Sequence, residues 1–103
     1  MNQEDDELVR VRLPRRNNGE MFAIAERLMG ASHVHTVCED GKARLGRIPG
    51  KLKKRMWIRE GDLLIVRPWD FQDEKADVLW RYTQTQANYL QRMGKLPEDL
   101  QKF

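Results

Sequence analysis

The stretch SHVHTVCEDGKARLGRI, residues 32–48, decides the fold because it predicts two strands joined by a tight turn. Its first part, Ser32–Cys38, alternates two sets of side chains with a period of two and is rich in β-branched residues. The pair Asp40-Gly41 is typical of a hairpin turn. Lys42–Ile48 is therefore the expected partner strand, which Pro49-Gly50 ends.

The alternation also assigns side chains to the two faces of this hairpin. In the first strand, one face carries Val34, Thr36 and Cys38, and the other carries His33, His35 and Val37. In the partner strand we expect Ala43 and Leu45 to face the core, and an outward parity for Lys42, Arg44 and Gly46.

Three further strands and two helical segments follow from similar patterns. Glu20–Met29 reads as a strand, although its Ala, Met, Leu and Glu residues also favour a helix. Lys51–Ile58 is too short for an independent helix but suits one or two docked turns. Leu63–Val66 and Ala76–Tyr82 are the fourth and fifth strands, and Trp80, Phe22 and Ile24 are expected in the core. Thr83–Met93 predicts a helix that Thr83 caps and Gly94 stops, with Ala87, Leu90 and Met93 on one face.

This order of elements is that of the oligonucleotide-binding (OB) fold. We expect an all-β, five-stranded OB-fold barrel (S1-like) with a short helical segment between strands three and four, a C-terminal helix and flexible tails. An unrelated small barrel of the SH3 kind is the alternative. The predicted division is a flexible tail over 1–19, acidic and then basic, the barrel over 20–82, the helix over 83–93 and a C-terminal tail over 94–103.

Composition excludes several classes of protein. The 103 residues amount to one domain, with 40% hydrophobic and 34% charged residues and a mean hydropathy of −0.78. The longest apolar run has five residues, whereas a membrane span needs about 20. Cys38 is the only cysteine, so an internal disulfide is impossible. The acidic start does not resemble a signal peptide. We expect neither a membrane protein, nor a secreted disulfide scaffold, nor a multidomain enzyme.

Positive charge is concentrated in residues 42–59. The chain as a whole has a formal net charge of +3, but this stretch holds eight basic residues and no acidic one. Such a block repels itself, and phosphate is the commonest partner that relieves the repulsion. The stretch therefore favours a surface for a polyanion, and a merely solvated face is the alternative.

The run RLGRIPGKLKKRMWIREGD, residues 44–62, closely resembles the translation initiation factor 1A family, the archaeal and eukaryotic counterpart of bacterial initiation factor one. The resemblance extends from about Gly19 to Leu96. The chain lacks the long acidic C-terminal extension of eukaryotic members, so it looks like the archaeal form. The resemblance implies a cytoplasmic, non-enzymatic OB-fold that binds the decoding A site of the small ribosomal subunit. It also implies a role in initiator tRNA recruitment and start-codon selection on mRNA, together with other initiation factors.

The first candidates for ribosomal RNA contacts are the basic residues Arg44, Arg47, Lys51, Lys53, Lys54 and Arg55. Lys42, Arg59 and His35 complete the predicted surface, together with Trp57. Trp57 can stack on a base or plug the core, and the loop residue Trp69 is expected to be exposed.

Metal binding and catalysis find no support in the sequence. His33 and His35 share a face that Cys38 does not, whereas a structural zinc site needs four ligands close together, and Cys38 suits a small core position. Acid pairs such as Asp73-Glu74 lack an apolar pocket that shifts their pKa values. We expect no metal, no cofactor and a monomer. A general RNA-binding protein or RNA chaperone on the same barrel, and a protein-interaction module using the helix and tails, stay open as alternatives.

Overall fold

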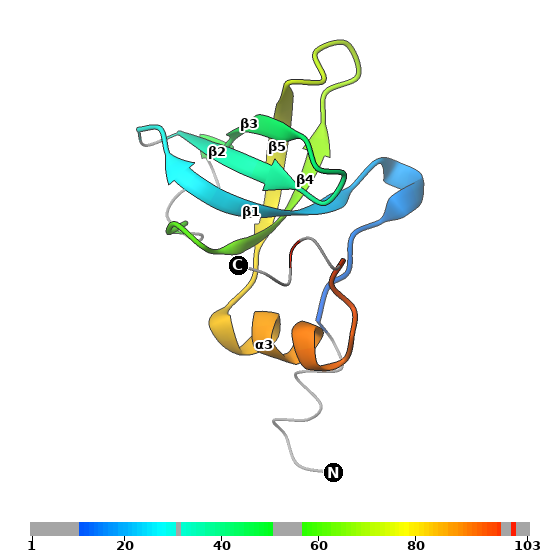
Figure 1. The fold of residues 1–103 in the computed structure, drawn as a ribbon. Helices are drawn as coiled ribbons and strands as arrows, with labels where there is room; N and C mark the ends of the chain where they lie inside the picture. Colours follow the sequence, from blue (N-terminus) through cyan, green and yellow to red (C-terminus); the bar gives the residue numbers. More distant parts are fainter. Residues whose placement is uncertain (1–10, 31, 51–56, 98–99, 101–103) are drawn as a thin grey trace.

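The computed structural model describes residues 11–30, 32–50, 57–97 and 100 of the chain. Five strands close into a barrel in the order β1-β2-β3-β5-β4 (Figure 1). Neighbouring strands are antiparallel except β3 and β5, which run parallel. The strands are β1 (Met21–Leu28), β2 (His33–Cys38), β3 (Ala43–Arg47), β4 (Leu63–Pro68) and β5 (Lys75–Arg81). This is the architecture of the OB fold, so the predicted fold class is confirmed.

The predicted strand ends differ from the observed ends by at most two residues. The first of these segments is a strand, so the helical alternative for Glu20–Met29 is wrong. Two helical elements accompany the barrel: the short 3-10 helix η1 (Arg16–Asn18) and the α-helix α3 (Gln84–Arg92). The predicted helical segment Lys51–Ile58 lies almost entirely outside the described residues.

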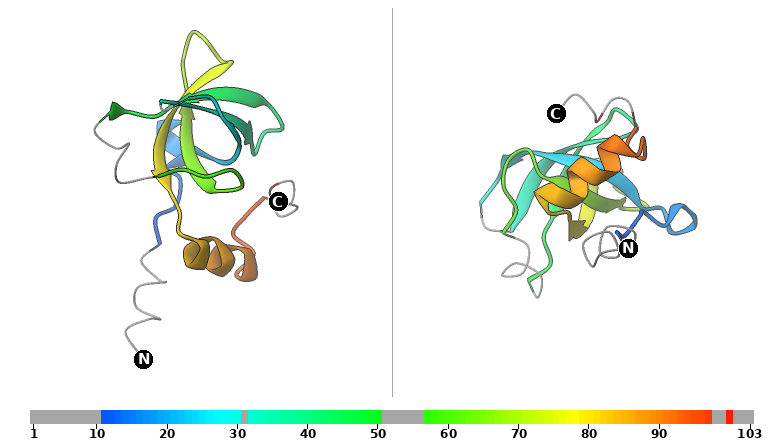
Figure 2. Two further views of the ribbon diagram at one scale, coloured as in Figure 1. Left: turned by 90° about the vertical axis from the view of Figure 1, so that its left-hand side faces the viewer. Right: turned by 90° about the horizontal axis from the view of Figure 1, so that it is seen from below.

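Apolar residues form two separate cores. The first fills the barrel and contains, among others, Ala23, Val34, Leu64 and Val78. The second lies outside the barrel wall, where α3 and the residues after it pack against the strands. Its members are Phe22, Ile24, Leu63, Ile65, Tyr82, Leu90, Leu96 and Leu100. Figure 2 shows α3 lying across one end of the barrel. The first half of β1 is therefore buried on both faces, and Phe22 and Ile24 belong to the second core rather than to the stripe that contains Val78.

The sequence around α3 explains its position. The Thr83 hydroxyl accepts a hydrogen bond from the Gln86 N–H, and the Gln86 side chain accepts one from the Thr83 N–H, so the predicted cap is a capping box. Leu90 is buried in the second core, while Met93, predicted on the same face, is 55% exposed. Gly94, with φ +68°, adopts the left-handed conformation just beyond the helix.

The predicted faces of β3 are wrong, and the cause is the length of the hairpin turn. Three residues, 39–41, form the turn: the Cys38 N–H donates to the Lys42 carbonyl at 2.8 Å, and Val37 pairs with Ala43. A two-residue turn at Asp40-Gly41 places Arg44 opposite Val37 instead. A shift of one residue moves every side chain of a strand to the other face. Arg44 and Gly46 consequently point into the barrel, and the outer positions are Ala43, Leu45 and Arg47.

The predicted core position of Trp80 is also wrong, because β5 contains a bulge. Val66 pairs with Val78 but the preceding Ile65 pairs with Trp80, which leaves Leu79 as the extra residue. Beyond Val78 the bulge reverses the order in which side chains alternate between the inside and the outside of the barrel. Trp80 therefore turns outward and is 40% exposed.

Parts of both predicted tails pack on the second core. Val11 packs against it, Pro14 is buried, and the Tyr82 hydroxyl donates a hydrogen bond to the Arg12 carbonyl. Leu96 and Leu100 are buried in the same cluster. Val11 before the predicted barrel and Leu96 and Leu100 after α3 thus contribute to the packed molecule. The division into tail, barrel and helix stays a prediction.

Candidate nucleic-acid interface

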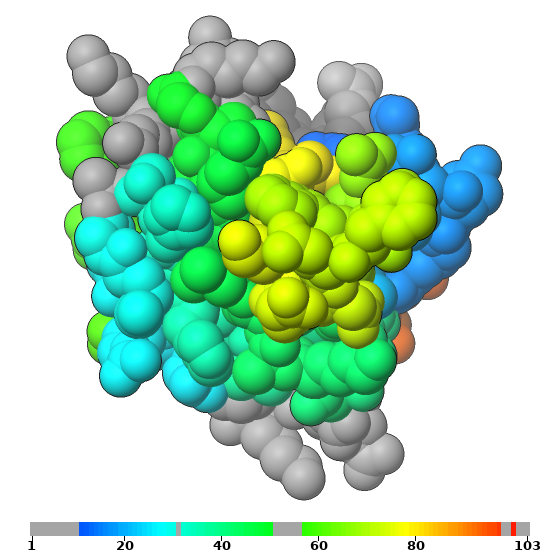
Figure 3. Space-filling model, turned by 90° about the horizontal axis from the view of Figure 1, so that it is seen from above, coloured from blue at the N-terminus to red at the C-terminus, as the bar shows by residue number. Residues whose placement is uncertain are grey.

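The outer face of β2, β3 and β5 gathers cationic and imidazole side chains. Strand pairing aligns His33 with Arg47 and Arg47 with Asp77 in one row across the sheet. The next row aligns His35, Leu45 and Lys75. We call this surface the outer β2–β3–β5 face. In Figure 3 the β4–β5 loop (yellow-green) faces the viewer, beside β2 and β3 (cyan to green).

A cluster of cations and one aromatic ring lies where this face meets the β4–β5 loop. The Trp69 indole N–H donates to Oδ1 of Asp77 at 3.2 Å, and the Arg47 Nε donates to the same oxygen at 3.3 Å. The Arg47 guanidinium carbon lies 6.0 Å from the Trp69 ring centroid, and the Lys75 Nζ lies 5.4 Å from it. Both distances are those of cation–π contacts. We name Arg47, Trp69, Lys75 and Asp77 the cation–aromatic cluster.

The cluster can bind phosphate and contact a base. Its two cations outnumber its one carboxylate, and the Arg47 side chain is 56% exposed. Trp69 was expected to be exposed and is half-buried. The Asp77 carboxylate orients the indole and the guanidinium, so a ligand meets groups that are already placed.

His35 lies on the outer face as predicted. Its Nδ1 is 3.2 Å from Oε1 of Glu26, a residue placed there by a bulge of β1 between Ala25 and Arg27. The side chains of His35 and Glu26 are 33% and 51% exposed, so both meet solvent at the surface. His33 lies in the neighbouring row on the same face.

Arg44 is not on the surface, in contrast to its predicted position. Its side chain is 2% exposed and donates to both Asp40 carboxylate oxygens at 3.0 and 2.9 Å. It also donates to the Asp73 carbonyl at 2.7 Å and to the Asp73 carboxylate at 3.1 Å. The hydrogen bonds from Arg44 hold the pKa of Asp40 below its ordinary value, against the opposing effect of burial. These partners occupy the guanidinium, which therefore does not belong to the exposed interface.

Gly46 is the neighbour of Arg44 on the inner side of β3. A side chain in place of this glycine would put its Cβ atom 3.0 Å from Val78 Cγ2 and 3.3 Å from Val34 Cγ1. The glycine is thus needed for packing inside the barrel.

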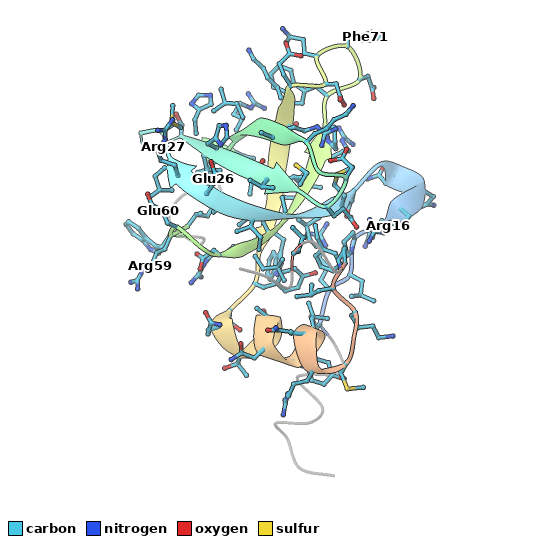
Figure 4. The ribbon with its side chains drawn as sticks, viewed as in Figure 1. Arg16, Glu26, Arg27, Arg59, Glu60 and Phe71 are labelled. Carbon is cyan, nitrogen blue, oxygen red and sulfur yellow. The ribbon has the colours of Figure 1, made fainter. Side chains whose placement is uncertain are left out.

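The other predicted contact residues are distributed differently. Lys42 is exposed and pairs with the Asp73 carboxylate at 3.0 Å. The hydrogen bonds from Lys42 and from Arg44 hold the pKa of Asp73 below its ordinary value. Trp57 is 71% exposed with a left-handed φ of +39°, so the interpretation as a core plug is wrong. Arg59 is exposed in the following turn, at the edge of the molecule shown in Figure 4. Lys51, Lys53, Lys54 and Arg55 lie outside the described residues.

Sequence reasoning missed Lys75 as part of this surface. Its position depends on the parallel pairing of β3 with β5, which joins residues 30 positions apart and leaves no local signal. The detectable signal was Trp69 in a loop flanked by basic residues, because an aromatic ring beside cations is typical of nucleic-acid contacts.

The described residues give no support for a metal site. Among them, no group of three or more His, Cys, Asp or Glu side chains is placed to hold a metal ion. Cys38 is fully buried in the barrel, where the sequence predicted a small core residue. Within the same part of the chain, no helix has the length and apolarity that crossing a membrane requires.

A closed five-stranded barrel with this order of strands defines the class of OB-fold barrels, which commonly bind nucleic acid on the face of strands two and three. Comparison with known proteins gives the family. Residues 9–103 match the family described as "Translation initiation factor 1A / IF-1". The chain is 57% identical over 102 residues to the translation initiation factor 1A of Thermoplasma volcanium, covering 99% of this chain and 83% of that protein.

Two further archaeal relatives carry the same name. The factor of Picrophilus torridus is 55% identical over 99% of this chain and 94% of its own length. The factor of Archaeoglobus fulgidus is 53% identical over 93% of this chain and 98% of its own. The chain belongs to the translation initiation factor 1A family. This is a family of non-enzymatic OB-fold factors with a role in translation initiation, so the predicted family and the absence of enzymatic function are confirmed.

Proposed function

We propose that this chain binds the decoding A site of the small ribosomal subunit, promotes recruitment of initiator tRNA and assists start-codon selection. The observation that carries the proposal is the cation–aromatic cluster on the outer β2–β3–β5 face. A few residues after Arg47, the chain continues into a basic segment that has no acidic residue and contains Lys51, Lys53, Lys54 and Arg55. We assign ribosomal RNA contacts to Arg47, Lys75, Trp69, Trp57, Arg59, His35, Lys42 and that basic segment.

The physical basis of binding is displacement of counterions from RNA. Each phosphate that a lysine or arginine neutralises releases counterions, so affinity falls steeply with salt. Arginine offers phosphate a planar fork with two bonds, and lysine offers a mobile point charge. An exposed ring such as that of Trp57 adds a stacking platform, worth about 1–3 kcal/mol per base by truncation.

A general RNA chaperone on the same barrel is the second candidate. Proteins that bind bare single strands usually stack several bases on aromatic side chains of the sheet. The outer positions of β2 and β3 carry none: they are His33, His35, Val37, Ala43, Leu45 and Arg47. This composition favours structured, phosphate-rich RNA.

The proposal further includes action as a monomer in the cytoplasm, with mRNA and other initiation factors bound to the same subunit.

Sedimentation with purified small ribosomal subunits tests the proposal. In low salt we expect the chain to sediment with the subunits, and an antibiotic that occupies the decoding site should displace it. Absence of co-sedimentation in low salt overturns the proposed function. Co-sedimentation that the antibiotic leaves unchanged places the binding site elsewhere on the subunit.

A further inference from the structure

Trp57 combines an exposed ring with a backbone conformation that tryptophan rarely adopts. The side chain is 71% exposed, and φ is +39°, within the left-handed region. Among the residues that the structure describes, it is the only one other than glycine in that region. For a bulky side chain this conformation costs free energy, so it persists only where the surrounding chain holds it in place.

Two anchors hold the chain immediately after Trp57. The Ile58 side chain is 9% exposed and belongs to the first core, which fills the barrel. The Arg59 N–H donates a hydrogen bond to Oδ2 of Asp62 at 2.8 Å. Trp57 therefore precedes one residue whose side chain is held in the core and one whose N–H is held by a carboxylate.

The Asp62 carboxylate is itself bound to β5, and its turn is bound to β1. The same Oδ2 accepts from the Arg81 Nε at 2.9 Å, and the side chains of Asp62 and Arg81 are 17% and 27% exposed. The Asp62 N–H donates to the Arg59 carbonyl at 3.1 Å and closes the turn. Two more bonds join the turn to Ala25: the Gly61 N–H donates to its carbonyl at 2.7 Å, and its N–H donates to the Asp62 carbonyl at 2.9 Å.

The charge of Asp62 does not favour RNA, so its presence in this turn points to another role. Residues 42–59 hold no acidic residue, and Asp62 lies three positions after Arg59. A carboxylate there repels phosphate within the screening length of about 8 Å at physiological salt. The ion pair with Arg81 offsets this charge, and the Arg59 N–H receives the acceptor oxygen that it needs.

We propose that Asp62 and Arg81 are positioning residues for Trp57, which they hold as a fixed stacking platform for an RNA base. Arg81 orients the Asp62 carboxylate, and the carboxylate binds the Arg59 N–H and so fixes the backbone that carries the indole. A ring that is placed before binding loses less conformational entropy when a base stacks on it. The inference rests on the proposed function, from which it takes the contact between Trp57 and RNA.

Fluorine NMR of the free chain tests the positioning without the ribosome. With 5-fluorotryptophan in place of tryptophan, each of the three tryptophans should give a signal, and Trp57→Phe identifies that of Trp57. Asp62→Ala and Arg81→Met should each shift the Trp57 signal and leave that of Trp69 unchanged. Glu60→Ala is the control, because it removes an exposed carboxylate from the same turn at the edge of the barrel (Figure 4). A Trp57 signal that Asp62→Ala leaves unchanged overturns the inference.

Affinity for purified small subunits separates positioning from electrostatics by the sign of one effect. Loss of a negative charge by itself strengthens binding to RNA, so Glu60→Ala should bind at least as tightly as the wild type. Asp62→Ala should bind roughly three- to tenfold more weakly, because the ring is no longer fixed. Asp62→Asn keeps an oxygen that can accept from the Arg59 N–H, and it should recover most of the lost affinity.

A double-mutant cycle shows whether the loss of affinity depends on the ring. In a Trp57→Ala background, Asp62→Ala should cause no further loss, whereas an unrelated structural defect adds its own. Melting temperatures establish that each variant is folded, and Arg81→Met replaces Asp62→Ala in the cycle if the latter does not fold. Additive losses, or wild-type affinity of Asp62→Ala, overturn the inference and leave the proposed function intact. Failure of the wild-type chain to bind small subunits overturns the proposed function, while the fluorine signals still test the positioning of Trp57.

Discussion

Among the predicted contact residues that the structure describes, Arg44 is the one that is buried. Its guanidinium joins the hairpin turn, through Asp40, to the β4–β5 loop, through Asp73. Burial of a charged side chain is costly unless its hydrogen bonds are satisfied, and these two carboxylates satisfy them. The residue therefore acts within the fold, positioning two loops, rather than as an exposed cation.

Replacing Arg44 tests this structural role. Arg44→Met should lower the free energy of unfolding by about 1–3 kcal/mol, since it removes several charge-assisted hydrogen bonds while leaving the partly exposed carboxylates free to turn to water. Arg27→Met, at an exposed position on β1, should change the stability by less than about 0.5 kcal/mol. Denaturant unfolding measures both. Equal stability of the two variants contradicts the buried network.

Asp40 makes the same network sensitive to acid. Its pKa in the folded chain lies below the ordinary 3.8, mainly because of the hydrogen bonds from Arg44. The resulting stabilisation is complete above the unfolded-state pKa and is lost as pH falls through the lower folded-state pKa. Asp40→Asn should therefore be less stable than the wild type at neutral pH, and the difference should shrink below about pH 4. Melting temperatures measured from pH 7 to pH 2 check this, and a difference that is constant over that range contradicts it.

At the scale of elements, patterns within a few residues were predictable and pairings between strands were not. The strand positions, the alternation in β2 and the cap of α3 all followed from local sequence. The faces of β3 did not, because turns of two and three residues both use Asp-Gly and only the pairing of Val37 with Ala43 distinguishes them. The outward orientation of Trp80 depends on a bulge at Leu79, and no residue type in this part of the sequence predicts the bulge.

In the candidate site, too, the positions of some residues could be predicted from the local sequence and those of others could not. Exposure of Lys42, Arg47 and Arg59 followed from their charge, since long cationic side chains are rarely buried. Arg44 is the exception, and its two carboxylate partners lie in different loops. Lys75 joins the surface only through the parallel pairing of β3 and β5.

The capping box of α3 gives a prediction at this scale. Thr83→Ala removes the hydroxyl that accepts from the Gln86 N–H, so the free energy of unfolding should fall by about 0.5–2 kcal/mol. Thr85→Ala changes the same residue type at an exposed position inside the first turn, where alanine is at least as favourable. Thermal unfolding should therefore separate the two variants. Equal melting temperatures contradict a stabilising role for the cap.

At the scale of the whole molecule, the candidate interface lies apart from α3, the helix that completes the second core. α3 covers the end of the barrel opposite the β4–β5 loop (Figures 1 and 2), while the cation–aromatic cluster adjoins that loop. A variant of the outer β2–β3–β5 face should accordingly change binding without changing stability much. A truncation in either core should do the reverse.

The most direct test of the central claim is the salt dependence of binding to purified small ribosomal subunits by Arg47→Gln/Lys75→Gln. The control Arg92→Gln/Lys95→Gln removes the same charge from exposed residues at the end of α3 and just beyond it. The face variant should melt like the wild type but bind more weakly. Its slope of log affinity against log salt should be shallower by roughly 0.7–0.9 for each phosphate that the variant no longer neutralises. A correctly folded face variant that retains the wild-type affinity and slope contradicts the assignment of this face to ribosomal RNA.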